Sequence, residues 1–594
     1  MPFIIPVLIV LGVIAAAVYG VTHWRKLRPS AEEDQGIGKA RRLYLYIVAL
    51  AALAAGASGL VQIGQFVLDG LFGGAAISPS NTQLAIGLAL AIVGLPLWAW
   101  HWQMASRAVR EHPAEAGALL RKLYVYAALG IATGLLLHAA IGLLQWAFLA
   151  RDFGGYHWSA VVVWSVVWVF YWHAESREGQ PSDDAMAVRR LYLYVASGAT
   201  LAVLATGAAR VVHLLLLSGY DALTSTPVLA PNDAGLWQDG VRKALAAALV
   251  GGTGWAFHWL RLAWTDRGSE LRRLYLVGYG SIGGAAAAMT AASTVVYGLL
   301  AWVFGAAGAT VAEHFRFFPG AIASLAAGLA VGIYHYGMAR REAAEAKEEW
   351  AGVGYWYPYI LAAAGLALLA IGIATAVGTA VGVLAGISTD ILVSAGSWKK
   401  GFALAVTLWV LGAPLWQRYW LGAQRRVAAG TEERVSPPRR GMVLLAVAVG
   451  LLALLGSLSH VLFVVLRDLL DGDLGRVAVQ DARISLGILA AVAMFLPYYW
   501  LTYRADQRAA PAKARQAAKT VTVLAGPGDD AAVQAIETAL GYEVERMVSA
   551  DANVRLLALS QADAEALAQR VGAAPAAKVL LVPDGNQMRV LPYR

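Results

Sequence analysis

Long apolar stretches separated by short polar segments dominate the chain up to Arg508. About 13 of these stretches approach the ~20 residues that a helix needs to cross the hydrocarbon layer of a bilayer. The first, Phe3–Trp24, carries its positive charges only behind it, at Arg25, Lys26 and Arg28. A cleaved signal peptide has positive charge ahead of its apolar core, so this stretch is predicted to be a retained helix with its N-terminus outside.

Two short phrases recur along these stretches. The phrase RRLYLY at 41–46 returns at 121–126, 189–194 and 272–277, and in weaker form at 355–360 and 439–444. Its anchor positions are Tyr44, Tyr124, Tyr192, Tyr275, Tyr357 and Met442. The second phrase lies near the end of the following helix and pairs two aromatic positions: His101 and Trp102, Tyr171 and Trp172, His258 and Trp259, His335 and Tyr336, Tyr419 and Trp420, Tyr499 and Trp500.

The spacing of these phrases predicts six two-helix repeats in the same orientation behind one N-terminal helix. The fold class is therefore an all-α polytopic membrane protein with about 13 transmembrane helices. The predicted boundaries are 1–28 for the N-terminal helix, 40–110, 120–178, 188–267, 271–342, 353–426 and 439–508 for the repeats, 509–519 for a basic linker and 520–594 for a C-terminal domain.

The paired phrases give the chain a family resemblance over residues 40–508. It resembles an uncharacterised bacterial family of multi-pass membrane domains, in which Arg-Leu-Tyr opens one helix and His-Trp lies near the end of the next. Repeats five and six depart from the pattern, because they lack the Arg pair or the Tyr and have Tyr in place of His. The resemblance implies a membrane location and no established activity.

Composition and charge support a membrane protein and exclude other classes. Hydrophobic residues make up 59% of the chain and charged residues 14%, with a mean hydropathy of +0.58, so a soluble enzyme is excluded for most of the length. Alternate loops hold 26 Lys and Arg against 9 in the intervening loops. This bias predicts a multi-pass protein of the inner or plasma membrane with the basic loops in the cytoplasm. It also explains the net charge of +9 without nucleic acid, and makes anionic lipids candidate partners.

The repeated phrases lie at the predicted cytoplasmic interface, where three interpretations are open. The simplest is that Trp and Tyr anchor the helices at headgroup depth while Arg snorkels to phosphate. Axial haem ligation by His101, His258 and His335 is a second interpretation, although other repeats have Tyr there and the chain has no cysteine for covalent attachment. A proton-responsive interface is the third.

A polar stripe is predicted deeper in the first helix of each repeat, because offsets of 14, 18 and 21 residues from the anchors share one helical face. Its members are Gln62, Gln65, His138, Gln145, Arg210, His213 and His460. An arginine inside a spanning helix is costly, so Arg210 is expected to contact a cavity or ligand, to hydrogen-bond between helices, or to snorkel outward. The histidines and glutamines other than His213 are expected to join helices.

The C-terminal domain is predicted to be a cytoplasmic, ferredoxin-like α/β domain. Strand patterns cover 520–526, 542–548, 554–560 and 577–583, helical patterns cover 529–540 and 561–571, and a final strand is predicted at 587–593. The GPGDD segment at 526–530 is a weak anion site because its two aspartates oppose phosphate. Docking, dimerisation or small-ligand sensing are the expected roles.

No catalytic constellation, metal site or cofactor is predicted from the motifs, so the chain is expected not to be an enzyme. The leading hypothesis is a structural, scaffolding or assembly subunit of a membrane complex, with a membrane-protein partner or a homo-oligomer. The alternative is a transporter or channel for a small polar or anionic solute that uses Arg210 and His213. A haem protein is a minor alternative.

Overall fold

A computed structural model describes most of the chain. The described residues are 39–73, 81–178, 183–224, 233–306, 310–345, 351–386, 397–429, 432–472, 475–509 and 520–593, without 527–528, 543, 550–559, 575, 577 and 585–586. The predicted N-terminal helix and the predicted strand at 554–560, apart from Ser560, lie outside these residues.

Apolar helices form nearly all of the described chain before residue 510. The longer ones are α2 (Lys39–Phe72), α3 (Asn81–Glu111), α4 (Leu119–Ala147), α5 (Gly155–Arg177), α6 (Asp183–Thr224), α7 (Asp233–Trp255), α9 (Gly283–Val303), α11 (Phe318–Glu345), α12 (Ala351–Gly386), α13 (Ser397–Trp416), α16 (Pro437–Leu470) and α17 (Arg476–Ala509). Within the described residues, nine helical segments are long and apolar enough to cross a membrane. The prediction of an integral membrane protein is thereby confirmed.

Short helical segments extend or connect these helices. They are the 3-10 turns η2 (Pro113–Gly117) and η5 (Phe315–Phe317), the π-helical turns η3 (Ala256–Leu262), η4 (Leu274–Ile282) and η6 (Gln417–Leu421), and the short α-helices α8 (Glu270–Arg273), α10 (Val311–His314), α14 (Gly422–Ala429) and α15 (Glu432–Val435).

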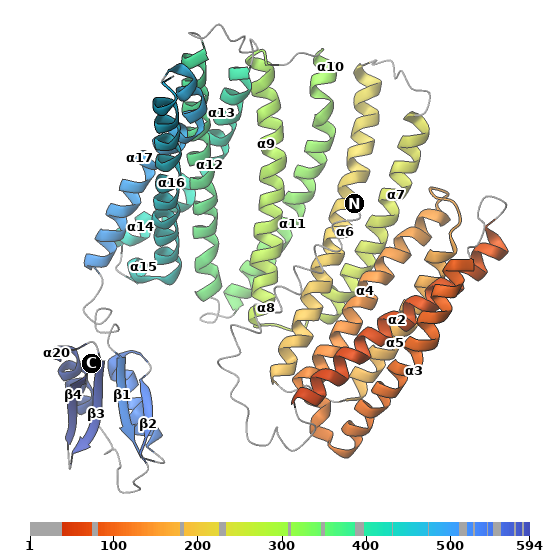
Figure 1. Cartoon of the computed structure of the whole chain (residues 1–594), viewed down its shortest axis with the longest axis horizontal. Coiled ribbons are helices and arrows are strands. Elements are labelled where there is room, and N and C mark those ends of the chain that lie inside the picture. Colours follow the sequence, from red (N-terminus) through yellow and green to blue (C-terminus); the bar gives the residue numbers. More distant parts are fainter. Residues whose placement is uncertain are drawn as a thin grey trace. The chain divides into compact units, whose positions relative to one another are not determined.

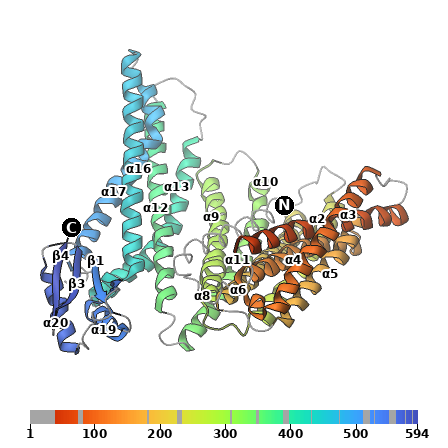
Figure 2. The same ribbon diagram turned by 60° about the horizontal axis from the view of Figure 1, so that its bottom comes forward.

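The chain divides into two compact units, Met1–Leu415 with Gly475–Arg483, and Trp416–Leu474 with Ile484–Arg594. In the first unit, α2 packs on α3, α4 on α5, α6 on α7, and α9 on α11, as the predicted hairpins require (Figure 1). Contacts of α4 with α6 and of α6 with α11 join one hairpin to the next, and Figure 2 shows the same neighbours from another side.

Small residues allow the close helix pairs. A Cβ on Gly284 of α9 would lie 2.4 Å from the backbone nitrogen of Gly332 in α11, and a Cβ on Gly207 of α6 would lie 2.5 Å from that of Ala248 in α7. Lipid tails provide no hydrophobic driving force between helices, so such close backbone approach contributes through van der Waals packing.

The C-terminal domain has a mixed four-stranded sheet of β1 (Thr520–Ala525), β2 (Glu545–Val548), β3 (Lys578–Asp584) and β4 (Gln587–Tyr593), in the order β2-β1-β3-β4. Strand β1 runs parallel to both β2 and β3, whereas β4 is antiparallel to β3. Helices α19 (Asp530–Leu540) and α20 (Gln561–Ala573) share one apolar core with the sheet. The predicted α/β character and the final strand are confirmed.

The ferredoxin-like order is wrong for the described strands. That fold splits its β-α-β unit by placing another strand between the two parallel ones, whereas here β1 pairs directly with β2, from Thr522 opposite Glu545 to Ala525 opposite Val548. Alternation of apolar residues fixes which segments are strands but carries no information about which strands pair.

Candidate functional site at the basic ends of the helices

The two repeated phrases contact each other within one repeat, at the helix ends that carry the Lys- and Arg-rich loops, here called the basic ends. The hydroxyl of Tyr192 lies 3.1 Å from Nε2 of His258, and that of Tyr275 lies 3.4 Å from Nε2 of His335. In the second repeat, Tyr171 replaces the histidine and its hydroxyl bonds to that of Tyr124. The motif histidines and tyrosines are therefore partners in the packing of a hairpin.

Both ring nitrogens of these histidines are engaged. Nδ1 of His258 lies 2.9 Å from the carbonyl oxygen of Gly254, and Nδ1 of His335 lies 2.8 Å from that of Val331. A carbonyl can only accept, so Nδ1 carries the proton and Nε2 accepts from tyrosine. Neither imidazole has a nitrogen left for iron, and the structure gives no support to the haem interpretation at these two positions.

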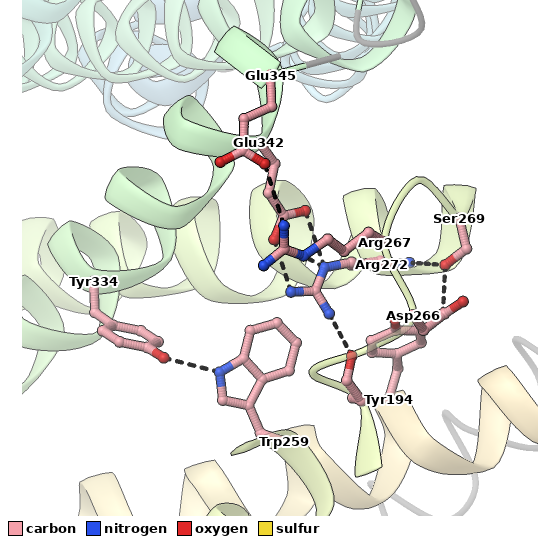
Figure 3. Close-up of polar contacts among 10 residues, drawn as sticks. Tyr194, Trp259, Asp266, Arg267, Ser269, Arg272, Tyr334, Glu342 and Glu345 are labelled. Atoms are coloured by element: carbon pink, nitrogen blue, oxygen red, sulfur yellow. Dashed lines mark hydrogen bonds and ion pairs between the residues drawn. The ribbon is translucent and has the colours of Figure 1, made fainter. Parts of the chain in front are cut away.

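Arg272 is the centre of a larger cluster. Its Nε lies 2.9 Å from both carboxylate oxygens of Glu342, and its Nη2 donates to Oε1 at 2.7 Å. The guanidinium lies 4.7 Å from the ring centre of Trp259, and Nη1 donates to the carbonyl of Ala263. Figure 3 shows the guanidinium between the carboxylate and the indole. Every nitrogen of this buried arginine therefore has an acceptor.

Neighbouring polar groups complete the surroundings of Arg272. The indole N–H of Trp259 donates to the hydroxyl of Tyr334 at 2.9 Å, and the hydroxyls of Tyr194 and Ser269 each donate to Asp266 at 2.7 Å (Figure 3). Ser269 also caps α8, because its side chain accepts from the backbone N–H of Arg272. The cap fixes the first turn of α8 and therefore the position of the backbone of Arg272.

The same arrangement occurs three times within the described residues. Arg121 pairs with Glu178 at 2.5 Å and lies 5.1 Å from the ring centre of Trp102. Arg439 pairs with Asp506 at 2.7 Å and lies 5.2 Å from that of Trp420. Arg121, Arg272 and Arg439 are only 2%, 1% and 1% exposed. We call these three sites the Arg–Trp–acid clusters.

Each cluster joins two consecutive repeats. The tryptophan comes from the end of an odd-numbered repeat, whereas the arginine and the acid come from the start and end of the even-numbered repeat that follows. The first and third repeats have a different ion pair, from the second basic residue of the phrase to an acid beyond the second helix: Arg42 with Glu115 and Arg190 with Asp266. The first four repeats therefore alternate in their ion pairs.

The local backbone is unusual at two of these clusters. The π-helical turn η3 contains His258 and Trp259, and η6 contains Tyr419 and Trp420. Ala263 follows the last residue of η3, and its carbonyl accepts from Nη1 of Arg272 as well as from the backbone N–H of Asp266. A cation at a helix C-terminus is also stabilised by the helix dipole.

The expectation that the motif arginines snorkel to phosphate is wrong for the clusters. Arg121, Arg272 and Arg439 are buried and bonded to acids, and Trp259 and Trp420 are 0% exposed. The interfacial-anchor interpretation fits the outward-facing aromatic residues, since Trp500 and Tyr336 are each 42% exposed. Of the other motif residues, His101 and Tyr171 are buried, whereas Trp102, Trp172 and Tyr419 are half-buried.

The predicted polar stripe does not form one continuous site. Within the part of the chain that the structure describes, one hydrogen bond joins two of its seven members, from Arg210 to His213 at 3.3 Å. Arg210 is exposed, and His460 is exposed and bonded to Ser485 of α17 at 2.9 Å. His138 packs near Tyr156 and His157, and Gln62, Gln65 and Gln145 are half-buried.

The acidic partners are the functional residues that the sequence analysis missed. Glu178, Glu342 and Asp506 each lie seven residues after the motif positions Tyr171, His335 and Tyr499, a spacing that is visible in the sequence. A buried arginine needs a carboxylate as its partner. An acid seven residues after the motif position in each even-numbered repeat is therefore a signal that predicts these pairs.

No group of three or more histidine, aspartate or glutamate side chains in the described residues could hold a metal ion. Three segments of the chain, residues 42–154, 221–337 and 355–488, match a family described as a domain of unknown function, DUF5671. Together they cover more than half of the sequence. The chain belongs to the DUF5671 family. Comparisons with curated proteins and with solved structures found no match.

The three DUF5671 matches each fall within two consecutive predicted repeats. Each match lies inside one pair of consecutive predicted repeats, 40–178, 188–342 or 353–508, and each pair contains one Arg–Trp–acid cluster. We call such a pair a four-helix unit.

Proposed function

We propose that this DUF5671 protein is a non-enzymatic structural or assembly subunit of a membrane complex. The observation that carries the proposal is the threefold recurrence of a buried cluster whose charges are balanced within the chain. The residues that recur bond to one another and hold the ends of neighbouring helices together.

The proposal includes the finer topology. About 13 spans, as one N-terminal helix followed by three four-helix units, fit the nine candidate spans together with α5, α7 and α13, which are second helices of hairpins. The bias of Lys and Arg among the loops favours cytoplasmic basic ends, with the C-terminal domain in the cytoplasm. That domain is then available to a soluble or membrane-bound partner.

Transport receives less support than assembly. A solute pathway through the helices requires polar side chains that converge, and the stripe residues do not. Arg210 and His213 are adjacent, but Arg210 is exposed on the surface of its unit. An exposed arginine on an apolar helix is better explained by a headgroup or by a partner protein that covers it.

Purification in mild detergent followed by native mass spectrometry tests the proposal. We expect a mass that exceeds one chain of 62.8 kDa by a stoichiometric partner or by further copies. A harsher detergent provides the control, because it should release the chain as a monomer of the same fold. A homogeneous monomer in the mild detergent contradicts an assembly role.

A further inference from the structure

A shallow groove lies between α16 and α17 at their basic ends. Arg440, Val443 and Leu444 of α16 form one wall, and Tyr503, Asp506 and Gln507 of α17 form the other. Both triplets have the i, i+3, i+4 spacing that places side chains on one helical face. The groove therefore has polar groups from both helices and an apolar floor from one.

The equivalent positions in the other four-helix units are filled. In the first four-helix unit, Lys122 takes the place of Arg440; it is 0% exposed and forms an ion pair with Glu178. Tyr126 takes the place of Leu444 and Glu175 that of Tyr503, and the tyrosine hydroxyl donates to the carboxylate at 2.6 Å. In the second unit, Val277 and Ala339 occupy these two positions, and both are buried in one apolar cluster. In the third unit, Leu444 is 50% exposed and Arg440 is exposed. The groove is thus specific to the third unit.

The charge in and around the groove is positive. The carboxylate of Asp506 is already bound by Nε and Nη2 of Arg439 at 2.7 and 3.2 Å. Arg439 is 1% exposed, and its Nη1 has no hydrogen-bond partner within the described residues. Arg440 therefore adds a positive charge that Asp506 does not compensate, and the groove favours an anion.

The position of the groove favours a lipid as the source of that anion. One turn before Tyr503, Trp500 is 42% exposed and lies 5.7 Å from the guanidinium of Arg504, an arrangement typical of headgroup depth. From Leu444, which is 50% exposed, the exposed apolar residues of α16 continue toward the middle of the span, including Leu445 and Val449. An acyl chain can lie along this surface while its phosphate remains at the polar end.

We propose that the groove between α16 and α17 binds an anionic phospholipid. Arg440 pairs with the phosphate, the hydroxyl of Tyr503 and the amide of Gln507 donate to headgroup oxygens, and Leu444 contacts the start of an acyl chain. This site does not depend on the proposed assembly role, since a monomer and an oligomer both present it to lipid.

Lipid titration of the full-length protein in mild detergent tests the site. Bound ligand is counted by native mass spectrometry with dioctanoyl phosphatidylglycerol, dioctanoyl phosphatidylcholine and glycerol 3-phosphate. We expect the first to bind most tightly and Arg440→Gln to weaken it about tenfold, as expected for loss of one charge-assisted contact. Tyr503→Phe should weaken it less, because a neutral hydrogen bond is lost.

Two further variants keep the result interpretable. Arg341→Gln removes an exposed arginine from the basic end of α11 and should bind lipid as the parent does. Leu444→Tyr introduces the residue that fills this position in the first unit and should block binding while the elution profile stays monodisperse. Equal binding of the two lipids, or unchanged binding by Arg440→Gln, overturns the proposal. Glycerol 3-phosphate binding as tightly as the lipid would assign the site to soluble phosphates instead.

Discussion

Arg272 and Arg210 are arginines on apolar helices of the same compact unit, yet their surroundings differ completely. Arg272 is 1% exposed and has a carboxylate, a backbone carbonyl and an indole around its guanidinium. Arg210 is exposed and lies 3.3 Å from His213. The comparison teaches that an arginine in a membrane helix indicates function only after its partners are known, because one with a buried acid is part of the framework.

The largest effect is expected from breaking the buried pair. Arg272→Met leaves Glu342 charged, buried and unpaired, and should lower the free energy of unfolding by about 3–5 kcal/mol. Adding Glu342→Leu removes the orphan charge and should recover much of the loss. Denaturant unfolding in detergent, followed by tryptophan fluorescence, measures both values. A double variant no more stable than Arg272→Met would show that the ion pair is not the main interaction.

A smaller effect is expected at the hydroxyl of Tyr275. Tyr275→Phe removes the acceptor of the indole N–H of Trp255, 3.2 Å away, and the partner of His335. The free energy of unfolding should fall by about 1–2 kcal/mol, because a half-buried donor loses its partner. Tyr44→Phe is the matched control, since Tyr44 holds the same position in the first repeat but is 61% exposed. Equal losses in the two variants would contradict the role assigned to the buried hydroxyl.

The smallest effect is expected at Arg210. Arg210→Met should change the free energy of unfolding by less than about 0.5 kcal/mol, because the side chain is exposed and bonded to one neighbour. The same fluorescence titration gives the value for direct comparison with Arg272→Met. A loss comparable to that of Arg272→Met would place Arg210 in an essential contact of the folded chain.

The sequence predicted what depends on local pattern. Apolar length identified the membrane helices, and the repeated phrases at Tyr192 and His258 located both helix ends of a hairpin. It did not predict that these two side chains bond to each other, because each phrase on its own predicts a contact with lipid headgroups. The burial of Arg272 was not predicted either, because it depends on Trp259 and Glu342, and Glu342 lies 70 residues away along the chain.

The C-terminal domain shows the same division between local and long-range information. The segments at β1, β3 and β4 were predicted within one or two residues, since alternation and turn residues are local signals. The pairing of Thr522 with Glu545 depends on how α19 returns the chain to the sheet. The anion site at GPGDD remains unsupported, because the backbone N–H of Gly526 donates to Asp529 at 2.7 Å.

The π-helical turn at Ala256–Leu262 affects how the chain tolerates the deletion of one residue. A π turn accommodates one more residue than the α-helical path, so removing a single codon within it should restore an ordinary helix. Because the turn itself absorbs the lost residue, the helix on either side would keep its phase around the axis. In-frame loss of one codon is therefore predicted to be less harmful here than in an ordinary α-helical segment such as α9, where every later side chain would rotate by about 100°.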